Sequence, residues 1–319
     1  MAENIILDRN LTIEAVRVTE AAAIAAAETM GRGDEKIADQ AAVDAMRTAL
    51  NRLQMAGTVV IGEGERGEAP MLFIGEEVGT GNGPKIDIAL DPLEGTTITA
   101  KGMPNGLAVL ALSEHGGLLN APDVYMDKIA AGPLVPPGAI DLDNTAGENV
   151  ANVAKALGKD TKDVVACILD RPRHGELIAA VREAGARIVL IGDGDVAGVM
   201  ATAMPETGID LYMGTGGAPE GVLAAAALRC IGGNIQGRLL FRNDDERGRA
   251  AKVGVEDLNR KYEITDLASG DVIFAATGVT DGNMLQGVRR TAKYLSTESV
   301  AMRARTGTVR WIRMQHPIK

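Results

Sequence analysis

The order of apolar and polar residues predicts two helices followed by short buried strands in the first part of the chain. Residues 11–30 form an alanine-rich stretch that predicts one long helix, with Asn10 as its candidate cap. Residues 41–55 keep one apolar face at helical spacing and follow Asp39, a candidate cap for a second helix. Three apolar runs then have the length of buried strands, at 58–61, 85–90 and 107–112.

Helical and strand patterns alternate after about residue 149. The expected helices are 149–157, 176–184 and 196–203, and the expected strands are 164–169, 187–191 and 209–213. This alternation predicts α/β layers with parallel strands. A proline-containing loop at 132–137 precedes it, so we expect an N-terminal half over 1–148 and a C-terminal half over 149–319. The remaining expected elements are a helix at 222–229, an exposed helix or loop at 243–260, and strands at 272–276 and 308–313.

An acidic turn follows the apolar run at 85–90. Its sequence is Asp91-Pro92-Leu93-Glu94-Gly95-Thr96-Thr97, and the strand is expected to stop near Asp91 because Pro92 cannot extend a hydrogen-bonded ladder. A short helix opening at residues 94–96 would bring Asp91, Glu94 and Thr96 together. Carboxylates that lie so near to each other favour binding of a hard divalent cation, Mg²⁺ or Mn²⁺, and such a cation also binds phosphate oxygens. A turn with helix-capping carboxylates is the alternative.

Other carboxylates also stand at the ends of predicted elements. Asp39 precedes a helix, Glu63 follows the strand at 58–61, and Glu220 lies in a glycine-rich segment before the helix at 222–229. Each alone is typical of a helix cap or a turn. Together with Asp91 and Glu94 they provide enough oxygen ligands for two or more cations, if the fold gathers them.

Composition narrows the class of protein. The 319 residues are 46% hydrophobic but only 3% aromatic, so aliphatic side chains and methionine must fill the core. The net charge is -10 and no basic tract stands out, which argues against nucleic acid as a partner. We find no apolar stretch long enough to span a membrane, and Cys167 and Cys230 lie in apolar runs that predict buried thiols. A cytoplasmic enzyme is therefore expected.

Several short blocks, in order along nearly the whole chain, resemble one enzyme family. They lie at residues 17–20, 31–34, 61–65, 68–71, 91–96, 171–174, 193–196, 216–221 and 276–278. The family is that of the class II fructose-1,6-bisphosphatases, within the lithium-sensitive sugar phosphatase superfamily. The resemblance implies an α/β fold, a layered α-β-α-β-α sandwich. It also implies a homo-oligomer, either a dimer or a tetramer.

The resemblance assigns roles to residues of this chain. Asp39 and Glu63 look like ligands of one metal, Mg²⁺ or Mn²⁺, and Asp91, Glu94 and Glu220 like ligands of a second. Thr96 resembles the hydroxyl that orients the attacking water. The implied substrate contacts are Glu94, Gly95, Thr96, Tyr125, Arg171, Pro172, Arg173, Asp193, Gly194, Asp195 and Gly217. The implied reaction is hydrolysis of fructose 1,6-bisphosphate to fructose 6-phosphate and phosphate, in gluconeogenesis.

The chemistry suits these residue types. Metal ions held by carboxylates would lower the pKa of bound water, so that hydroxide forms at neutral pH, and would neutralise the charge of a phosphate monoester, so no covalent nucleophile is required. A second phosphate, far from the reacting one, would be bound by Tyr125, Arg171 and Arg173, because a guanidinium matches phosphate geometry. Lys128 is a further candidate, but we expect it to be a solvated surface charge. His174 is expected to be structural.

Alternative functions stay open at this point. Hydrolysis of sedoheptulose 1,7-bisphosphate or another sugar phosphate would use the same site. A nicotinamide-dependent oxidoreductase is suggested by Gly192-Asp193-Gly194-Asp195-Val196-Ala197, although acidic side chains there would repel a pyrophosphate. A catalytically silent relative is suggested by Glu35 and Gly67, which replace the lysine and aspartate usual in the family. Lys36 and Glu68 are the candidate replacements.

Overall fold

The computed structural model describes residues 10–64 and 70–318, which fold into two compact units. The first unit comprises Met1–Leu119 and Ser269–Lys319, and the second comprises Asn120–Ala268. This division differs from the predicted one, which met at residues 148 and 149, because the C-terminal strands return to the sheet of the first unit. Within the described residues, no helix has the length and apolar character needed to cross a membrane.

The first unit is an eight-stranded sheet in the order β12-β13-β11-β4-β3-β1-β2, with β14 paired to β13. The strands are β1 (Ala56–Ile61), β2 (Glu77–Val78), β3 (Lys85–Glu94), β4 (Leu107–Glu114), β11 (Val272–Gly278), β12 (Arg289–Arg290), β13 (Tyr294–Arg303) and β14 (Thr308–Pro317). β1 and β3 are parallel, whereas β4 and β11 are antiparallel to their neighbours.

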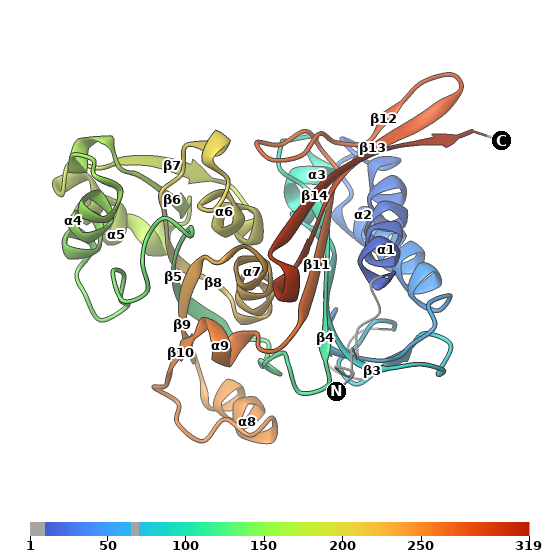
Figure 1. Cartoon of the computed structure of the whole chain (residues 1–319), viewed down its shortest axis with the longest axis horizontal. Helices are drawn as coiled ribbons and strands as arrows, with labels where there is room; N and C mark the ends of the chain where they lie inside the picture. The colour runs from blue at the N-terminus through green and yellow to red at the C-terminus, as the bar shows by residue number, and fades with distance from the viewer. Residues whose placement is uncertain (1–9, 65–69, 319) are drawn as a thin grey trace. The chain divides into compact units, whose positions relative to one another are not determined.

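Helices α1 (Leu11–Ala27) and α2 (Glu35–Leu50) lie side by side on this sheet (Figure 1). The alanines of α1 allow close approach to the sheet, and Thr19 Oγ1 lies 2.7 Å from Thr277 Oγ1 of β11. The predicted cap Asn10 makes no side-chain capping hydrogen bond. Helix α2 begins at Glu35 and is capped by Asp34, which accepts a hydrogen bond from Ile37 N–H at 3.1 Å. Asp39 therefore lies inside the helix and does not cap it.

The prediction that β3 stops near Asp91, because Pro92 follows, is wrong. The strand continues to Glu94 through a shift in register, since Asp91 pairs with Val109 and Glu94 with Leu107. An advance of three residues along β3 thus corresponds to two residues along β4, so β3 contains a β-bulge. A proline is tolerated in a bulge, which is why Pro92 does not end the strand. The expected short helix then follows as α3 (Thr96–Ala100), after Gly95 in the left-handed conformation at φ 91°.

The second unit is a six-stranded sheet in the order β10-β9-β5-β8-β6-β7. Its strands are β5 (Tyr125–Ala131), β6 (Val165–Leu169), β7 (Arg187–Ile191), β8 (Leu211–Gly217), β9 (Asn234–Leu240) and β10 (Lys261–Glu263). β6 is parallel to β7 and β8, but β5, β9 and β10 pair antiparallel with their neighbours. The expectation of parallel strands is therefore correct for only part of this sheet.

Helices cover both faces of the second sheet. The helices are α4 (Ala146–Leu157), α5 (Gly175–Glu183), α6 (Asp195–Ala201), α7 (Ala218–Ile231), α8 (Asp244–Lys252) and α9 (Ile264–Leu267). α4 and α5 pack on one face, around Ile129, Ile168 and Leu211. α6 and α7 pack on the opposite face, where Gly198 approaches Tyr212 and Gly221 approaches Met126. The predicted α/β class is thus confirmed in both units.

Candidate active site

The carboxylates of the first unit lie at the ends of two adjacent parallel strands. Ile61 of β1 pairs with Ala89 of β3, and two residues further along each strand come Glu63 and Asp91. Because parallel strands end at the same edge of a sheet, these two side chains belong to neighbouring positions. Two of the predicted ligands, nearly thirty positions apart in sequence, thus follow a paired position of β1 and β3 at one edge of the sheet.

The bulge of β3 positions the other groups of the acidic turn. Leu93 N–H donates to Asp91 Oδ1 at 3.0 Å, which fixes the first carboxylate against the turn. Glu94 is only 3% exposed, and a carboxylate buried to this extent is costly without positive charge nearby. Gly95 then reverses the backbone so that Thr96 begins α3. Asp91, Glu94 and Thr96 are therefore held on one short segment of fixed geometry.

Asp39 is placed on the helix that packs against this segment. α2 contacts both β3 and α3, and Gly31 N–H and Gly33 N–H donate to the carbonyls of Thr99 and Ala100 at 3.0 and 2.9 Å. Burial raises the pKa of the Asp39 carboxyl above its usual range. A bound cation would oppose this shift and restore the charged form, so the environment of Asp39 fits a metal ligand.

The oxygen donors therefore fit a hard cation by type. Across residues 10–64 and 70–318, however, no three His, Cys, Asp or Glu side chains already converge into a group that could enclose an ion. Glu65, Gly67 and Glu68 lie outside the described residues, and Glu35 is the exposed first residue of α2. The metal assignments accordingly stay predictions, supported by the strand ends and by the burial of Glu94.

In the second unit the predicted residues gather where β5, β8 and the helices α6 and α7 meet. Lys128 of β5 is 1% exposed, and its Nζ donates to Asp195 Oδ2 at 2.5 Å and to the Gly217 carbonyl at 2.8 Å. The expectation of a solvated Lys128 is therefore wrong. Lys128 pairs with Gly214 of β8 and Gly237 of β9 in the sheet, and its side chain lies close to Gly216 and Gly221.

Glu220 lies in the first turn of α7 beside this ion pair. Burial, together with the charge of Asp195 and against that of Lys128, raises the pKa of its carboxyl to about 7. Its Oε2 is buried and accepts no hydrogen bond from the described residues. An orphaned carboxylate oxygen of this kind fits a cation ligand, which is the role predicted for Glu220.

A basic cluster surrounds Tyr125 at the start of β5. The guanidinium carbons of Arg173 and Arg242 lie 4.9 and 4.8 Å from the centre of the Tyr125 ring. Arg173 also donates from Nε and Nη2 to the Thr215 carbonyl, at 3.1 and 2.7 Å. Arg242 is oriented by the buried Glu246, which accepts from its Nε at 2.6 Å. The cluster offers two oriented guanidinium groups to an anion.

Sequence reasoning missed Arg242. It follows β9, whose Leu240 pairs directly with Tyr125, so the strand delivers Arg242 to the edge of the aromatic ring. Arg242 joins the cluster only because residues 234–240 form a strand next to β5, which no sequence motif marks. Arg171, by contrast, was predicted to bind substrate, and it lies 3.7 Å from Asp193 Oδ1.

The segment that precedes α6 also holds its predicted residues close to the site. Gly194 adopts φ 80° and allows the turn between Asp193 and Asp195, the first residue of α6. Asp193 is paired with Arg171 and Asp195 with Lys128, so both carboxylates are held in place by cations. His174 is structural, as expected: its Nδ1 donates to the Leu169 carbonyl and its Nε2 accepts from Thr215 N–H.

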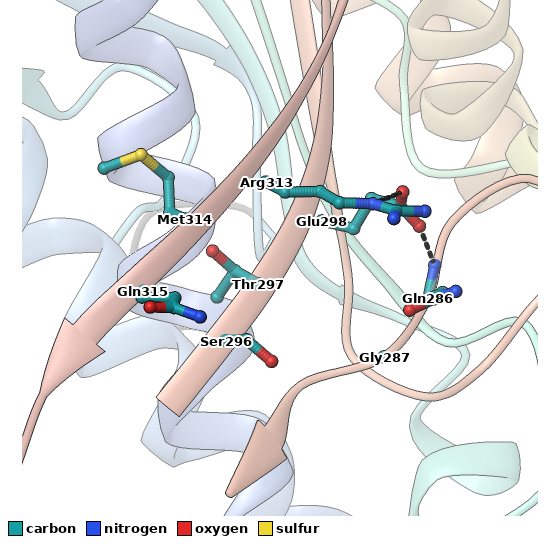
Figure 2. A pocket seen from close by; sticks show the side chains of 8 residues that line it. All are labelled: Gln286, Gly287, Ser296, Thr297, Glu298, Arg313, Met314 and Gln315. Carbon is teal, nitrogen blue, oxygen red and sulfur yellow. Dashed lines mark hydrogen bonds and ion pairs between the residues drawn. The ribbon is translucent and has the colours of Figure 1, made fainter. Parts of the chain in front are cut away.

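A separate cavity of about 260 Å³ lies in the first unit, between β13, β14 and the segment at 286–287. Figure 2 shows Arg313 and the Gln286 backbone converging on the carboxylate of Glu298, at 2.7 Å each. The eight residues that line the cavity are Gln286, Gly287, Ser296, Thr297, Glu298, Arg313, Met314 and Gln315. They include none of the predicted site residues, so this cavity is not the candidate active site.

The chain resembles known proteins over almost its whole length. Residues 9–316 match the family model described as bacterial fructose-1,6-bisphosphatase, glpX-encoded. The chain is 46% identical to the class 2 fructose-1,6-bisphosphatase 1 of Escherichia coli (strain K12), over 97% of this chain and 95% of the relative. It is 45% identical to a D-fructose 1,6-bisphosphatase class 2/sedoheptulose 1,7-bisphosphatase of Synechococcus sp. (strain JA-3-3Ab), over 97% and 96%.

A search of solved structures adds a distant match. The crystal structure of the extragenic suppressor protein suhB from Bartonella henselae has 15% sequence identity and a TM-score of 0.35, over 61% of this chain and 74% of that chain. The sequence matches extend across almost the whole chain and carry the assignment. They also exclude the oxidoreductase alternative. The chain belongs to the glpX-encoded bacterial fructose-1,6-bisphosphatases, a family of phosphoric monoester hydrolases.

Proposed function

We propose that this chain hydrolyses the 1-phosphate of fructose 1,6-bisphosphate and releases fructose 6-phosphate and inorganic phosphate. The observation that carries the proposal is the set of carboxylates at the ends of β1 and β3, next to the hydroxyl of Thr96, in a chain of this family. A phosphate monoester needs charge neutralisation and an activated water, and such carboxylates support both.

The metal is proposed to be Mg²⁺ or Mn²⁺, held by oxygen ligands. Asp39 and Glu63 would hold one ion, and Asp91 and Glu94 a second. Glu220 belongs to the second unit, and the family resemblance assigns it to that second ion. When bound, the ions would lower the pKa of water and offset the charge of the phosphate.

The side chains of this chain would then do the positioning. The Thr96 hydroxyl would orient the attacking water by a hydrogen bond, because it begins α3 directly after the acidic bulge. Asp193 and Asp195 would accept hydrogen bonds from the sugar hydroxyls, and the backbone of Gly95, Gly194 and Gly217 would allow close approach. No covalent intermediate is needed.

The second phosphate would be bound at the basic cluster around Tyr125. Arg173 and Arg242 are both oriented by acceptors within the second unit, so less side-chain freedom is lost when the phosphate binds. Arg171 and Pro172 complete the predicted contacts on the same segment. This cluster would distinguish a sugar bisphosphate from a monophosphate.

Sedoheptulose 1,7-bisphosphate is a second candidate substrate, because the Synechococcus relative carries both activities in its name. The family resemblance also predicts a homo-oligomer, a dimer or a tetramer, which light scattering would test. The sequence predicts a cytoplasmic location.

Phosphate release with Mg²⁺ or Mn²⁺, measured over a panel of sugar phosphates, tests the proposal. We expect metal-dependent release from fructose 1,6-bisphosphate, with sedoheptulose 1,7-bisphosphate compared directly. A folded protein that releases no phosphate from any bisphosphate would reject the proposal and favour the catalytically silent relative.

A further inference from the structure

Lys128 is a buried charge to which the proposed function gives no role. It lies in the middle of β5, is 1% exposed, and faces the side of the sheet on which α6 and α7 pack. A lysine is almost never buried this completely unless it is paired. Because it lies in a central strand, away from any exposed edge of the sheet, we expect its charge to hold particular neighbouring groups in place.

The hydrogen bonds of Lys128 join two of the predicted substrate contacts. Its Nζ donates to Asp195 Oδ2 at 2.5 Å and to the Gly217 carbonyl at 2.8 Å. The Tyr212 hydroxyl also donates to Asp195 Oδ2, at 3.5 Å. Both of these donors bond to the same carboxylate oxygen, and neither bonds to Oδ1.

Glycines make this arrangement possible. A Cβ at Gly216 would lie 2.1 Å from Asp195 Oδ2 and 3.0 Å from Lys128 Nζ, and a Cβ at Gly221 would lie 3.3 Å from Lys128 Cδ. The backbones of β8 and α7 therefore pass directly against the ion pair. Asp195 cannot keep its position if Gly216 gains a side chain, so the geometry at β8 is tightly fixed.

We propose that Lys128 is the positioning residue for the sugar-binding contacts of the second unit. It orients Asp195 so that Oδ1 accepts a sugar hydroxyl, and it fixes Gly217 at the end of β8. Lys128 itself does not touch the substrate in this account. The inference rests on the proposed function and adds to it a residue that acts through Asp195.

The test compares Lys128→Met with wild type in steady-state phosphate release from fructose 1,6-bisphosphate. We expect KM to rise about 10- to 100-fold, the range for losing a hydrogen bond to a charged group, while kcat changes less than about threefold. Lys261→Met is the matched control, since Lys261 pairs with Asp141 and Asp143, away from the predicted contacts. That control should leave KM unchanged.

A double-mutant cycle separates positioning from a purely structural role. Because Lys128 is proposed to act through Asp195, Lys128→Met with Asp195→Asn should bind substrate no more than about threefold worse than Asp195→Asn alone. Fully multiplicative effects would overturn the inference. So would a folded Lys128→Met enzyme with lowered thermal stability and unchanged KM.

A second variant, at Gly216, tests the same role of Lys128. If Lys128→Met does not fold, Gly216→Ala displaces the same carboxylate without removing the charge, and it should raise KM in the same way; an unchanged KM there would overturn the inference. Wild type without phosphate release would reject the proposed function itself, whereas active wild type beside an unaffected Lys128→Met would reject only the role of Lys128.

Discussion

Arg242 allows the sharpest prediction about substrate choice. Its guanidinium is held by the buried Glu246 at 2.6 Å and lies 4.8 Å from the centre of the Tyr125 ring. Replacing it with methionine keeps much of the side-chain volume but removes the charge and every donor. A charge-assisted hydrogen bond contributes roughly 1.5–3 kcal/mol, so Arg242→Met should raise KM for fructose 1,6-bisphosphate about 10- to 150-fold.

The assay compares two substrates that share the reacting phosphate. Fructose 1-phosphate lacks the second phosphate, so its kcat/KM should change less than about threefold in Arg242→Met, while that of the bisphosphate falls. Arg247→Met is the matched control, because Arg247 is exposed and paired only with Asp244 among the described residues. Equal losses on both substrates would refute the assignment of Arg242 to the second phosphate, and so would an unchanged bisphosphate KM.

Three further predictions concern catalysis, pH dependence and stability. Thr96→Ala should lower kcat by roughly 100-fold or more and preserve metal binding by calorimetry, whereas loss of substrate binding alone would contradict its role. The pKa of Glu220 is raised to about 7, so the metal-free protein should lose stability as pH rises from about 4.5 to 7; chelator-treated Glu220→Gln should not show this dependence in thermal melts. Thr277→Val removes hydrogen bonds to Thr19 and Ser299 at 2.7 and 2.8 Å and should cost about 1–3 kcal/mol in urea unfolding; an unchanged free energy of unfolding would count against that network.

The linkage for Glu220 has a definite sign. Its folded-state pKa lies above the ordinary value of 4.5, so between about 4.5 and 7 the folded protein binds a proton that the unfolded chain has released. Stability that depends on that proton is present at low pH and is lost as pH rises through the folded pKa. Mg²⁺ or Mn²⁺ should weaken this dependence, because a bound cation favours the ionised carboxylate.

The acidic turn could be predicted from the sequence because its signals are local. An apolar run, a proline and a glycine before Thr96 define a strand end and a short helix start, and both are present. The bulge was missed, since it depends on how β3 pairs with β4. Asp39 was similarly given a capping role because the start of α2 was predicted too late in the chain.

The strands that the sequence did not predict contain polar residues and lack the continuous apolar pattern of a buried strand. β13 contains Thr297, Glu298 and Ser299, which read as polar but are all buried against partners on other elements. The expectation of parallel strands is confirmed for β6, β7 and β8, the strands that it concerned, but β5 and β9, which were also missed, add antiparallel pairs to the sheet. Tertiary pairing, which no single-chain pattern records, decided each of these cases.

The charged residues of the second unit show the same limit. Lys128 reads as a surface charge because lysine rarely lies in a core, and it is buried beside Gly216 of β8 and Gly221 of α7, which only the fold brings next to it. Arg242 carries no motif, and β9 alone brings it to Tyr125. The residue types of the site could thus be predicted from the sequence, but their partners required the fold.

The central claim is that carboxylates at the ends of β1 and β3 bind the divalent ions used in hydrolysis. The most direct measurement is a titration of Mn²⁺ by electron paramagnetic resonance on wild type, Asp91→Asn and Glu94→Gln, with phosphate release measured on the same samples. We predict that both variants lose Mn²⁺ affinity and nearly all turnover while they stay folded. Wild-type Mn²⁺ affinity and turnover in both variants would contradict the account.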